Sequence, residues 1–252
     1  MHNTQVQDLD RIITELKDLG FCILRAHLRS SRVDVCREAF WPTLKRYLEV
    51  NADNPNRGPQ RHFLPMPWDA NCYAPEFFFD PDVLSVMRNV MDERIVADQW
   101  GCDVPLGDSC FQQFHADYQR SLFAEQPDLR LPAYMLAMSF GLVRITAENG
   151  AMEVVPCTHR MPRTEALGQI AAGILTPCTV SLEIGDVLLR HPWTLHRGTP
   201  NSTRVPRPLV TIRYVRRWYW DDSREVNAIP APLWRTMTVE QRSIMRFPLA
   251  DE

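Results

Sequence analysis

The chain has 252 residues, of which 45% are hydrophobic and 23% are charged, and its formal net charge is −3. This length allows one large domain or two small ones, with enough apolar residues for a full core. A weakly acidic chain has no general basic field, so we expect no nucleic-acid partner. No apolar run reaches the roughly 20 residues that cross a bilayer, and the polar residues 1–18 do not form a signal peptide, so we expect no membrane partner.

The seven cysteines are scattered along the chain and form no C-x-x-C pair. This pattern argues against a disulfide framework and against a structural zinc site. Cysteines without such roles fit a reducing compartment, and we predict a cytoplasmic protein. The oligomeric state does not follow from the sequence.

The N-terminal residues predict helices for the most part. Apolar residues recur at helical spacing over residues 5–19, and Gly20 is the expected stop. Phe21–Leu24 is a short apolar run that predicts a strand. Ser30 and Ser31 are expected to cap a second helix, which Pro42 should kink or begin.

A long stretch, residues 51–79, lacks a clear period and predicts an irregular segment. Its second half is aromatic, which favours a cover over an active site. Asp80 followed by Pro81 predicts the start of another helix. Thr238 and Gln241 have the spacing of a capping box, which predicts a C-terminal helix.

After residue 93 the pattern changes to short strands. The candidates are residues 94–98, 109–117, 134–145, 151–155, 179–184, 187–191, 194–197 and 208–216. Helices followed by many short strands predict a single mainly β domain, a barrel or sandwich braced by α-helices. We divide it into a helical part, 1–93, a β core, 94–216, and a helical tail, 217–252.

His115 and Asp117 are the residues that best indicate a function. On a strand, side chains two residues apart point to the same side, so this imidazole and this carboxylate would face one point. His196, from a distant strand, could complete the set. Two histidines and one carboxylate occupy one face of an octahedral metal and leave three positions open, an arrangement typical of non-haem Fe(II) oxygen chemistry.

Arg207 follows His196 by eleven residues, at the start of the predicted strand 208–216. A guanidinium at the base of a pocket can hold a carboxylate through two parallel hydrogen bonds. An oxygenase that uses 2-oxoglutarate needs such an anchor for the carboxylate that does not chelate the metal. The alternative interpretation is a surface arginine.

Three stretches together resemble the phytanoyl-CoA dioxygenase family of Fe(II)- and 2-oxoglutarate-dependent oxygenases. They are Gln112–Asp117, Glu148–His159 and Gly185–His191, and the resemblance continues through His196, Asn201 and Arg207. It covers residues 112–214, with weaker similarity in the N-terminal helices.

The resemblance implies a double-stranded β-helix, the jelly-roll or cupin-like fold. It implies Fe(II), O2 and the cosubstrate 2-oxoglutarate, with His115, Asp117 and His196 as iron ligands and catalytic centre. Arg207 would anchor the cosubstrate, assisted by Thr199 or Asn201.

The sequence departs from the family pattern at Cys157, where a glycine is usual, and at Arg190, where an aromatic or apolar residue is common. The cysteine puts the local turn in doubt, and the arginine is a candidate for tuning the substrate. Related halogenases replace the carboxylate ligand with a small residue, so the presence of Asp117 argues against halogenation.

Four further residues are candidates for contact with the substrate: Gln112, Gln113, Arg190 and Arg213. Strand alternation with His115 favours Gln113, whereas the motif favours Gln112. Arg190 and Arg213 could bind an anionic group, or they could pair with acids at the barrel rim.

The remaining histidines have ordinary interpretations. His159 and His191 are expected to be structural. For His62, in the aromatic part of 51–79, we expect an exposed loop position, although contact with the substrate is an alternative.

These observations predict an oxygenase that hydroxylates, or otherwise oxidises, a C–H bond of a small molecule and releases succinate and CO2. The expected substrate is a polar metabolite or natural-product intermediate, with or without a carboxylate. Two alternatives stay open: a cupin-like metalloenzyme that does not use 2-oxoglutarate, and a non-catalytic barrel that acts as a binding module.

Overall fold

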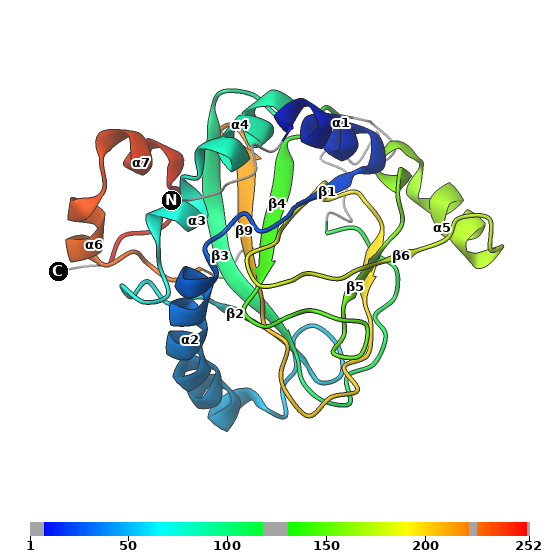
Figure 1. Ribbon diagram of the computed structural model, residues 1–252, viewed down its shortest axis with the longest axis horizontal. Helices are drawn as coiled ribbons and strands as arrows, with labels where there is room; N and C mark the ends of the chain where they lie inside the picture. Colours follow the sequence, from blue (N-terminus) through cyan, green and yellow to red (C-terminus); the bar gives the residue numbers. More distant parts are fainter. Residues whose placement is uncertain (1–7, 118–130, 222–225, 251–252) are drawn as a thin grey trace.

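Two antiparallel sheets face each other in the computed structural model, which describes residues 8–117, 131–221 and 226–250 (Figure 1). The larger sheet has the strand order β1-β7-β4-β9-β3-β2, and the smaller has the order β6-β5-β8. Neighbours in these sheets come from distant parts of the chain, as expected for the predicted jelly-roll architecture.

The bounds of the elements are as follows. The larger sheet contains β1 (Phe21–Leu24), β2 (Arg61–Pro65), β3 (Ile95–Pro105), β4 (Met135–Gly141), β7 (Val187–Arg190) and β9 (Leu209–Arg216). The smaller sheet contains β5 (Met152–Val154), β6 (Cys178–Val180) and β8 (His196–Gly198). The helices are α1 (Leu9–Leu19), α2 (Ser30–Asn51), α3 (Pro75–Phe78), α4 (Pro81–Val90), the 3₁₀ turn η1 (Thr158–Arg160), α5 (Arg163–Ala171), α6 (Ala231–Thr236) and α7 (Val239–Ile244).

The outer face of the larger sheet carries the main hydrophobic core. Alternate residues of β3, β4 and β9, such as Trp100, Met138 and Ile212, pack there against Leu16 of α1 and Phe40 of α2. Side chains on the other parity therefore point toward the smaller sheet. The N-terminal helices brace the sheet from outside and leave its inner face free for a site.

The two sheets close on each other through a second apolar cluster. Leu188 and Leu209 from the larger sheet pack in it with Val154 and Val180 from the smaller sheet. Because these side chains fill one part of the space between the sheets, polar residues on the inner face lie elsewhere along the strands.

Most of the helix boundaries follow the sequence signals. α1 ends at Gly20, whose φ of 83° is left-handed, and Asp80 caps α4 by accepting from the backbone of Asp82 and Val83. The capping box of Thr238 and Gln241 is present at α7. These predictions are confirmed because each depends on contacts within one turn of the chain.

The predicted start of the second helix was wrong. Its cap position is Arg29, without a side-chain cap, and Pro42 lies inside a helix that begins at Ser30. Burial of Val33, Cys36, Phe40 and Leu44 on one side of α2 compensates for the hydrogen bond that the proline cannot donate.

Residues 1–93 are not only helical, because β1 and β2 join the larger sheet. β2 pairs with β3 and lies within the stretch 51–79, which was predicted to be irregular. His62 in β2 is fully buried, so its predicted exposure was wrong as well. Within the described ranges, no helix is both long and apolar enough to cross a membrane.

Cys157 adopts a left-handed conformation with φ of 66°, just before η1. A left-handed residue is commonly glycine, because a Cβ strains this region by about 1–2 kcal/mol. The turn is therefore kept although the usual glycine is absent.

Candidate metal centre

His115 and His196 lie opposite each other in an isolated antiparallel bridge. The backbone N–H of each donates to the carbonyl of the other, with both distances 2.9 Å. Residues that exchange two such bonds project their side chains to the same side. The two imidazole centroids are consequently 4.4 Å apart.

Asp117 completes the group from the same segment. Its backbone N–H donates to Pro192 O at 2.9 Å, and its Oδ1 lies 3.2 Å from His196 Nε2. One ligand atom each of His115, Asp117 and His196 lies within 4.8 Å of the others. At bond lengths of about 2.1 Å, neighbouring ligands of one octahedral ion lie about 3 Å apart, so small adjustments would close this set around a metal.

The expected strand 109–117 is not present, and its prediction was wrong. The segment is irregular apart from the bridge at His115. Convergence with Asp117 therefore comes from hydrogen bonds to the segment 192–198, including Gln112 N to Gly198 O at 3.0 Å, and not from regular strand alternation.

Backbone carbonyls hold both imidazoles by Nδ1. His115 Nδ1 is 2.8 Å from Gln113 O, and His196 Nδ1 is 2.9 Å from Thr194 O. A carbonyl can only accept, so Nδ1 carries the proton and the Nε2 lone pair is free for a metal.

The protonation states also suit a cation. Burial, together with a smaller effect of the nearby His196, lowers the pKa of His115 to about 4. Burial by itself would raise the pKa of Asp117, but the Arg190 guanidinium and His196 hold it well below the usual range. At neutral pH the site thus offers a neutral imidazole at His115 and an ionised carboxylate at Asp117.

The depressed pKa of His115 predicts how stability depends on pH. Between the ordinary value of 6.5 and about 4, the unfolded chain binds a proton at His115 that the folded, metal-free protein does not. We expect the urea midpoint of the metal-free protein to fall as the pH decreases through this window. His115→Gln should show a shallower fall, and an equally steep fall in that variant would contradict the assignment.

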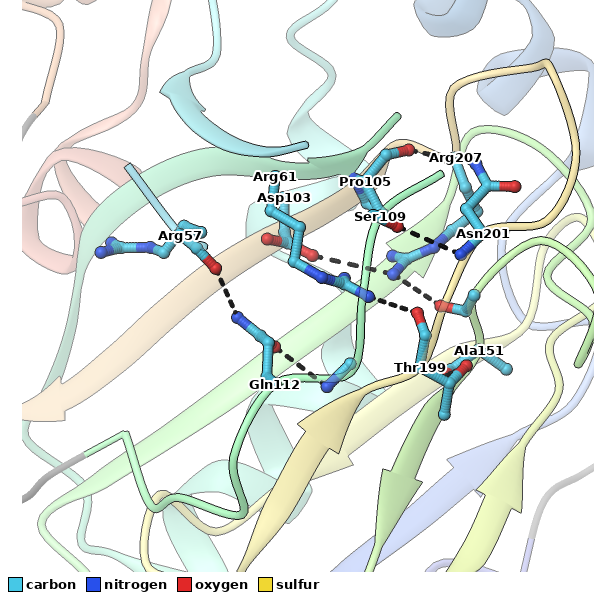
Figure 2. A network of polar contacts seen from close by, with 12 residues as sticks. Arg57, Arg61, Asp103, Pro105, Ser109, Gln112, Ala151, Thr199, Asn201 and Arg207 are labelled. Atoms are coloured by element: carbon cyan, nitrogen blue, oxygen red, sulfur yellow. Dashed lines mark hydrogen bonds and ion pairs between the residues drawn. The ribbon is translucent and has the colours of Figure 1, made fainter. Parts of the chain in front are cut away.

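Two buried arginines, Arg61 and Arg207, belong to a second polar group, which is drawn in Figure 2. Arg61 on β2 is fully buried, and Arg207, just before β9, is 2% exposed. Arg207 Nη2 donates to Gly150 O at 2.8 Å and lies 3.7 Å from Asp103 Oδ2. Arg61 donates to the carbonyls of Cys110 and Thr199.

The charges of this group are not balanced. The pKa of Arg207 is lowered to about 10, because burial and, to a smaller degree, the neighbouring Arg61 outweigh the opposite effect of Asp103. Nε and Nη1 of Arg207 and Nη1 of Arg61 are buried without a hydrogen-bond partner in the described part of the chain. Buried donors and buried charges are costly unless they are paired. Two guanidinium groups and one carboxylate therefore fit an anion such as a carboxylate.

Gly198 connects the two groups, because β8 begins at His196 and ends at this glycine. Its backbone N–H donates to Gln112 Oε1 at 2.9 Å. A Cβ at Gly198 would lie 2.5 Å from Arg61 Nη1 and 2.8 Å from Gln112 Oε1. A side chain here would displace the arginine, so the close approach requires glycine.

The two residues that were expected to assist Arg207 are engaged in backbone contacts. Thr199 Oγ1 donates to Ala151 O at 2.7 Å. The Asn201 amide donates to Pro105 O and Val205 O and accepts from Thr203. Both shape the turn that leads to Arg207, and their contact with a cosubstrate stays a prediction.

Gln112, rather than Gln113, has its side chain in the described network. Gln112 Nε2 donates to Arg57 O at 2.9 Å, whereas Gln113 supplies a backbone carbonyl to His115. The structure does not place either against a substrate.

Arg190 and Arg213 both pair with acids. Arg190 Nη2 is 2.6 Å from Asp117 Oδ2, and Arg213 contacts Asp98 at 2.8 Å and Asp221 at 2.9 Å. This outcome matches the alternative of acid pairing. Contact of either arginine with the substrate stays a prediction.

Arg61 was missed by the sequence analysis. It lies in a stretch without a clear period, and a single arginine there has no motif. The short run Arg61-His62-Phe63-Leu64-Pro65, with its two apolar residues before a proline, was the available signal, because a strand at this position places Arg61 and Phe63 on one face.

Solved structures with the same fold include several iron- or 2-oxoglutarate-dependent enzymes. The non-haem α-ketoglutarate-dependent epimerase SnoN from nogalamycin biosynthesis is 19% identical, with a TM-score of 0.59 over 82% of each chain. EctD from S. alaskensis, with 2-oxoglutarate and 5-hydroxyectoine, is 19% identical, with a TM-score of 0.64 over 85% of this chain and 78% of that one. AviO1 from Streptomyces viridochromogenes Tue57 is 16% identical, with a TM-score of 0.63 over 86% of this chain and 99% of that one.

At these identities the solved structures establish the fold, a cupin-like jelly roll. The family is established by the sequence, because residues 18–209 match the model of the phytanoyl-CoA dioxygenase (PhyH) family. This match includes His115, Asp117, His196 and Arg207. The chain therefore belongs to the phytanoyl-CoA dioxygenase family and is an enzyme of the non-haem Fe(II)- and 2-oxoglutarate-dependent class.

Proposed function

We propose that His115, Asp117 and His196 hold Fe(II), that Arg207 binds the distal carboxylate of 2-oxoglutarate, and that the enzyme oxidises a C–H bond of a small polar metabolite. Hydroxylation is the expected outcome. The observation that carries this proposal is that β8 begins at His196 of the two-histidine, one-carboxylate group and ends at Gly198, which lies against Arg61 Nη1, a buried guanidinium nitrogen without a partner in the described chain.

The residues of the centre would each have a defined part. The carbonyls of Gln113 and Thr194 keep both imidazoles in the tautomer that binds a metal. Arg207 and Arg61 would orient the cosubstrate from the other end, because two fixed cations select a carboxylate at a set distance from the metal. When bound, iron and 2-oxoglutarate supply the oxidising power for a C–H bond, with succinate and CO2 as co-products.

The inner wall of the larger sheet supports a small polar substrate. In the strand register, Arg213 lies opposite Gln99 of β3 and opposite Ala137 of β4, so the side chains of these three residues are on the inner face. Ser139 of β4 and Thr211 of β9 lie on the same face, two residues from Ala137 and Arg213, and their hydroxyl oxygens are hydrogen-bonded at 2.9 Å. Hydroxyl, amide and charged groups on one wall can bind a polar molecule by hydrogen bonds.

The solved structures with this fold include enzymes that carry out different reactions on small molecules. SnoN is an epimerase, SnoK is a carbocyclase, and EctD was solved with 5-hydroxyectoine. By this analogy the substrate of the present enzyme is a metabolite or a natural-product intermediate. Because Arg190 and Arg213 are already paired, a carboxylate on the substrate is not needed to balance their charge.

Anaerobic titration tests the cofactor part of the proposal. Fe(II) followed by 2-oxoglutarate should produce a visible charge-transfer band in the wild-type protein. Succinate release in air, measured across a library of polar metabolites, then identifies the substrate by coupled product formation. A protein that binds Fe(II) without responding to 2-oxoglutarate would instead be a cupin-like metalloenzyme, and one that binds neither would be a non-catalytic barrel.

Arg213 gives a separate prediction about substrate binding. We expect Arg213→Ala to raise KM for the substrate roughly tenfold or more, the equivalent of a charge-assisted hydrogen bond of about 1.5–3 kcal/mol. The affinity for 2-oxoglutarate should not change. Arg216→Ala is the matched control, because Arg216 lies on the same strand and pairs with Asp92 at 2.8 Å. An unaltered KM in Arg213→Ala would remove this residue from the substrate site.

A further inference from the structure

Arg190 is a buried cation on the inner face of the larger sheet. It lies in β7, opposite Phe21 of β1 and Ala137 of β4 in the strand register, and it is 5% exposed. A guanidinium in this position needs a counter-charge. Asp117 supplies it, with Nη2 of Arg190 2.6 Å from Oδ2.

The two oxygens of the Asp117 carboxylate are consequently divided. Oδ2 accepts from Arg190, while Oδ1 faces the histidines and lies 3.2 Å from His196 Nε2. A carboxylate that is free to rotate can give a metal one oxygen or both. Oδ2 of Asp117 is held by a charge-assisted hydrogen bond from Arg190. The carboxylate would have to break this bond before it could rotate and give both oxygens to a metal.

The same guanidinium also lies against the second histidine. Arg190 Nη1 is 3.2 Å from His196 Nδ1, and that nitrogen is itself 2.9 Å from Thr194 O. Because the carbonyl takes the Nδ1 proton, the guanidinium cannot also donate to Nδ1. With this tautomer, the guanidinium lies against the imidazole without a hydrogen bond to Nδ1.

We propose that Arg190 is a positioning residue that holds Asp117 by Oδ2, so that only Oδ1 is presented to the metal and three coordination positions stay open. This inference rests on the proposed metal centre. Arg190 would then orient the metal ligand Asp117 and would not bind the substrate. The inference requires no change of protonation at the centre.

Co(II) binding under anaerobic conditions provides a test that does not depend on turnover. The full chain should be titrated with Co(II), with affinity and the intensity of the d–d bands, which reports coordination number, as readouts. We expect Arg190→Met to weaken Co(II) binding roughly 10- to 100-fold, as is typical when a partner of a metal ligand is removed. Its d–d intensity should differ from that of the wild type, and Arg190→Lys should recover part of the affinity.

Arg197→Met is the matched control. Arg197 neighbours His196 in sequence but pairs with Glu153 at 2.7 Å, so its loss should leave Co(II) binding unchanged. Wild-type affinity and spectrum in folded Arg190→Met would overturn the inference. Should that variant not fold, a wild-type spectrum and affinity in Arg190→Lys would overturn it, because lysine cannot reproduce the guanidinium geometry. Failure of the wild-type protein itself to bind Co(II) would instead refute the proposed metal centre.

Discussion

His115→Ala is expected to lose Fe(II) binding and, with it, the release of succinate. His115 supplies one of three ligands, and two remaining ligands cannot define one face of an octahedral ion. The loss of metal affinity should exceed the roughly 10- to 100-fold that removal of an outer partner typically causes. Isothermal titration with Fe(II) under anaerobic conditions measures it directly.

His62→Phe is a suitable control for this experiment. His62 is also an imidazole of the larger sheet region, but it is buried against Tyr47, with its ring edge-on at a centroid distance of 5.7 Å. Phenylalanine keeps this ring contact and removes two nitrogens that lack partners among the described residues. Metal binding should be retained. Equal Fe(II) affinity in His115→Ala and in the wild type would contradict the assignment of the centre.

Arg207→Met is expected to separate cosubstrate binding from metal binding. Removal of the guanidinium should weaken 2-oxoglutarate binding roughly 10- to 150-fold for each charge-assisted hydrogen bond that is lost. Fe(II) affinity should stay at the wild-type level, because the contacts of Arg207 among the described residues are with Gly150 and Asp103 and not with the three metal ligands. The intensity of the charge-transfer band as a function of 2-oxoglutarate concentration gives the affinity.

Stability provides an independent control for Arg207→Met. The guanidinium is buried with two nitrogens that have no partner in the described ranges, and its loss removes one hydrogen bond, to Gly150 O, so the melting temperature of the ligand-free protein should fall by only about 2–4 °C. In the wild type, 2-oxoglutarate should raise that temperature by mass action, and the variant should show little response. Wild-type 2-oxoglutarate affinity in a folded variant would show that another residue anchors the cosubstrate. Arg61→Met would then be the next variant to examine, because Arg61 Nη1 is also buried without a hydrogen-bond partner among the described residues.

The sequence predicted the local elements well where the signals lie within a few residues. Phe21–Leu24 is the strand that the apolar run predicted, and the left-handed Gly20 ends α1. The expected period of β9 and the capping box at Thr238 are also present. Such features depend on turn chemistry and on alternation, which neighbouring residues determine.

Segments whose conformation depends on distant partners were predicted poorly. Residues 109–117 have the composition of a strand, but they are irregular, held by single bonds to residues 192–198. β2 was missed because its pairing partner, β3, supplies most of the reason for its conformation. Pro42 was expected to kink the second helix or to mark its start, and the second alternative was wrong, because α2 runs through Pro42 from Ser30 to Asn51.

By itself, the sequence determined the fold family, the enzyme class and the identity of the candidate ligands, because residue types and motif spacing carry the chemistry of such a centre. Only the tertiary structure decided how these residues are held. The bridge between His115 and His196, the pairing of Arg190 with Asp117 and the approach of Arg61 to Arg207 all join residues that are distant in sequence. A side chain's charge and donors are properties of one residue, but the partner that satisfies them in a buried site is fixed by the packing of two sheets.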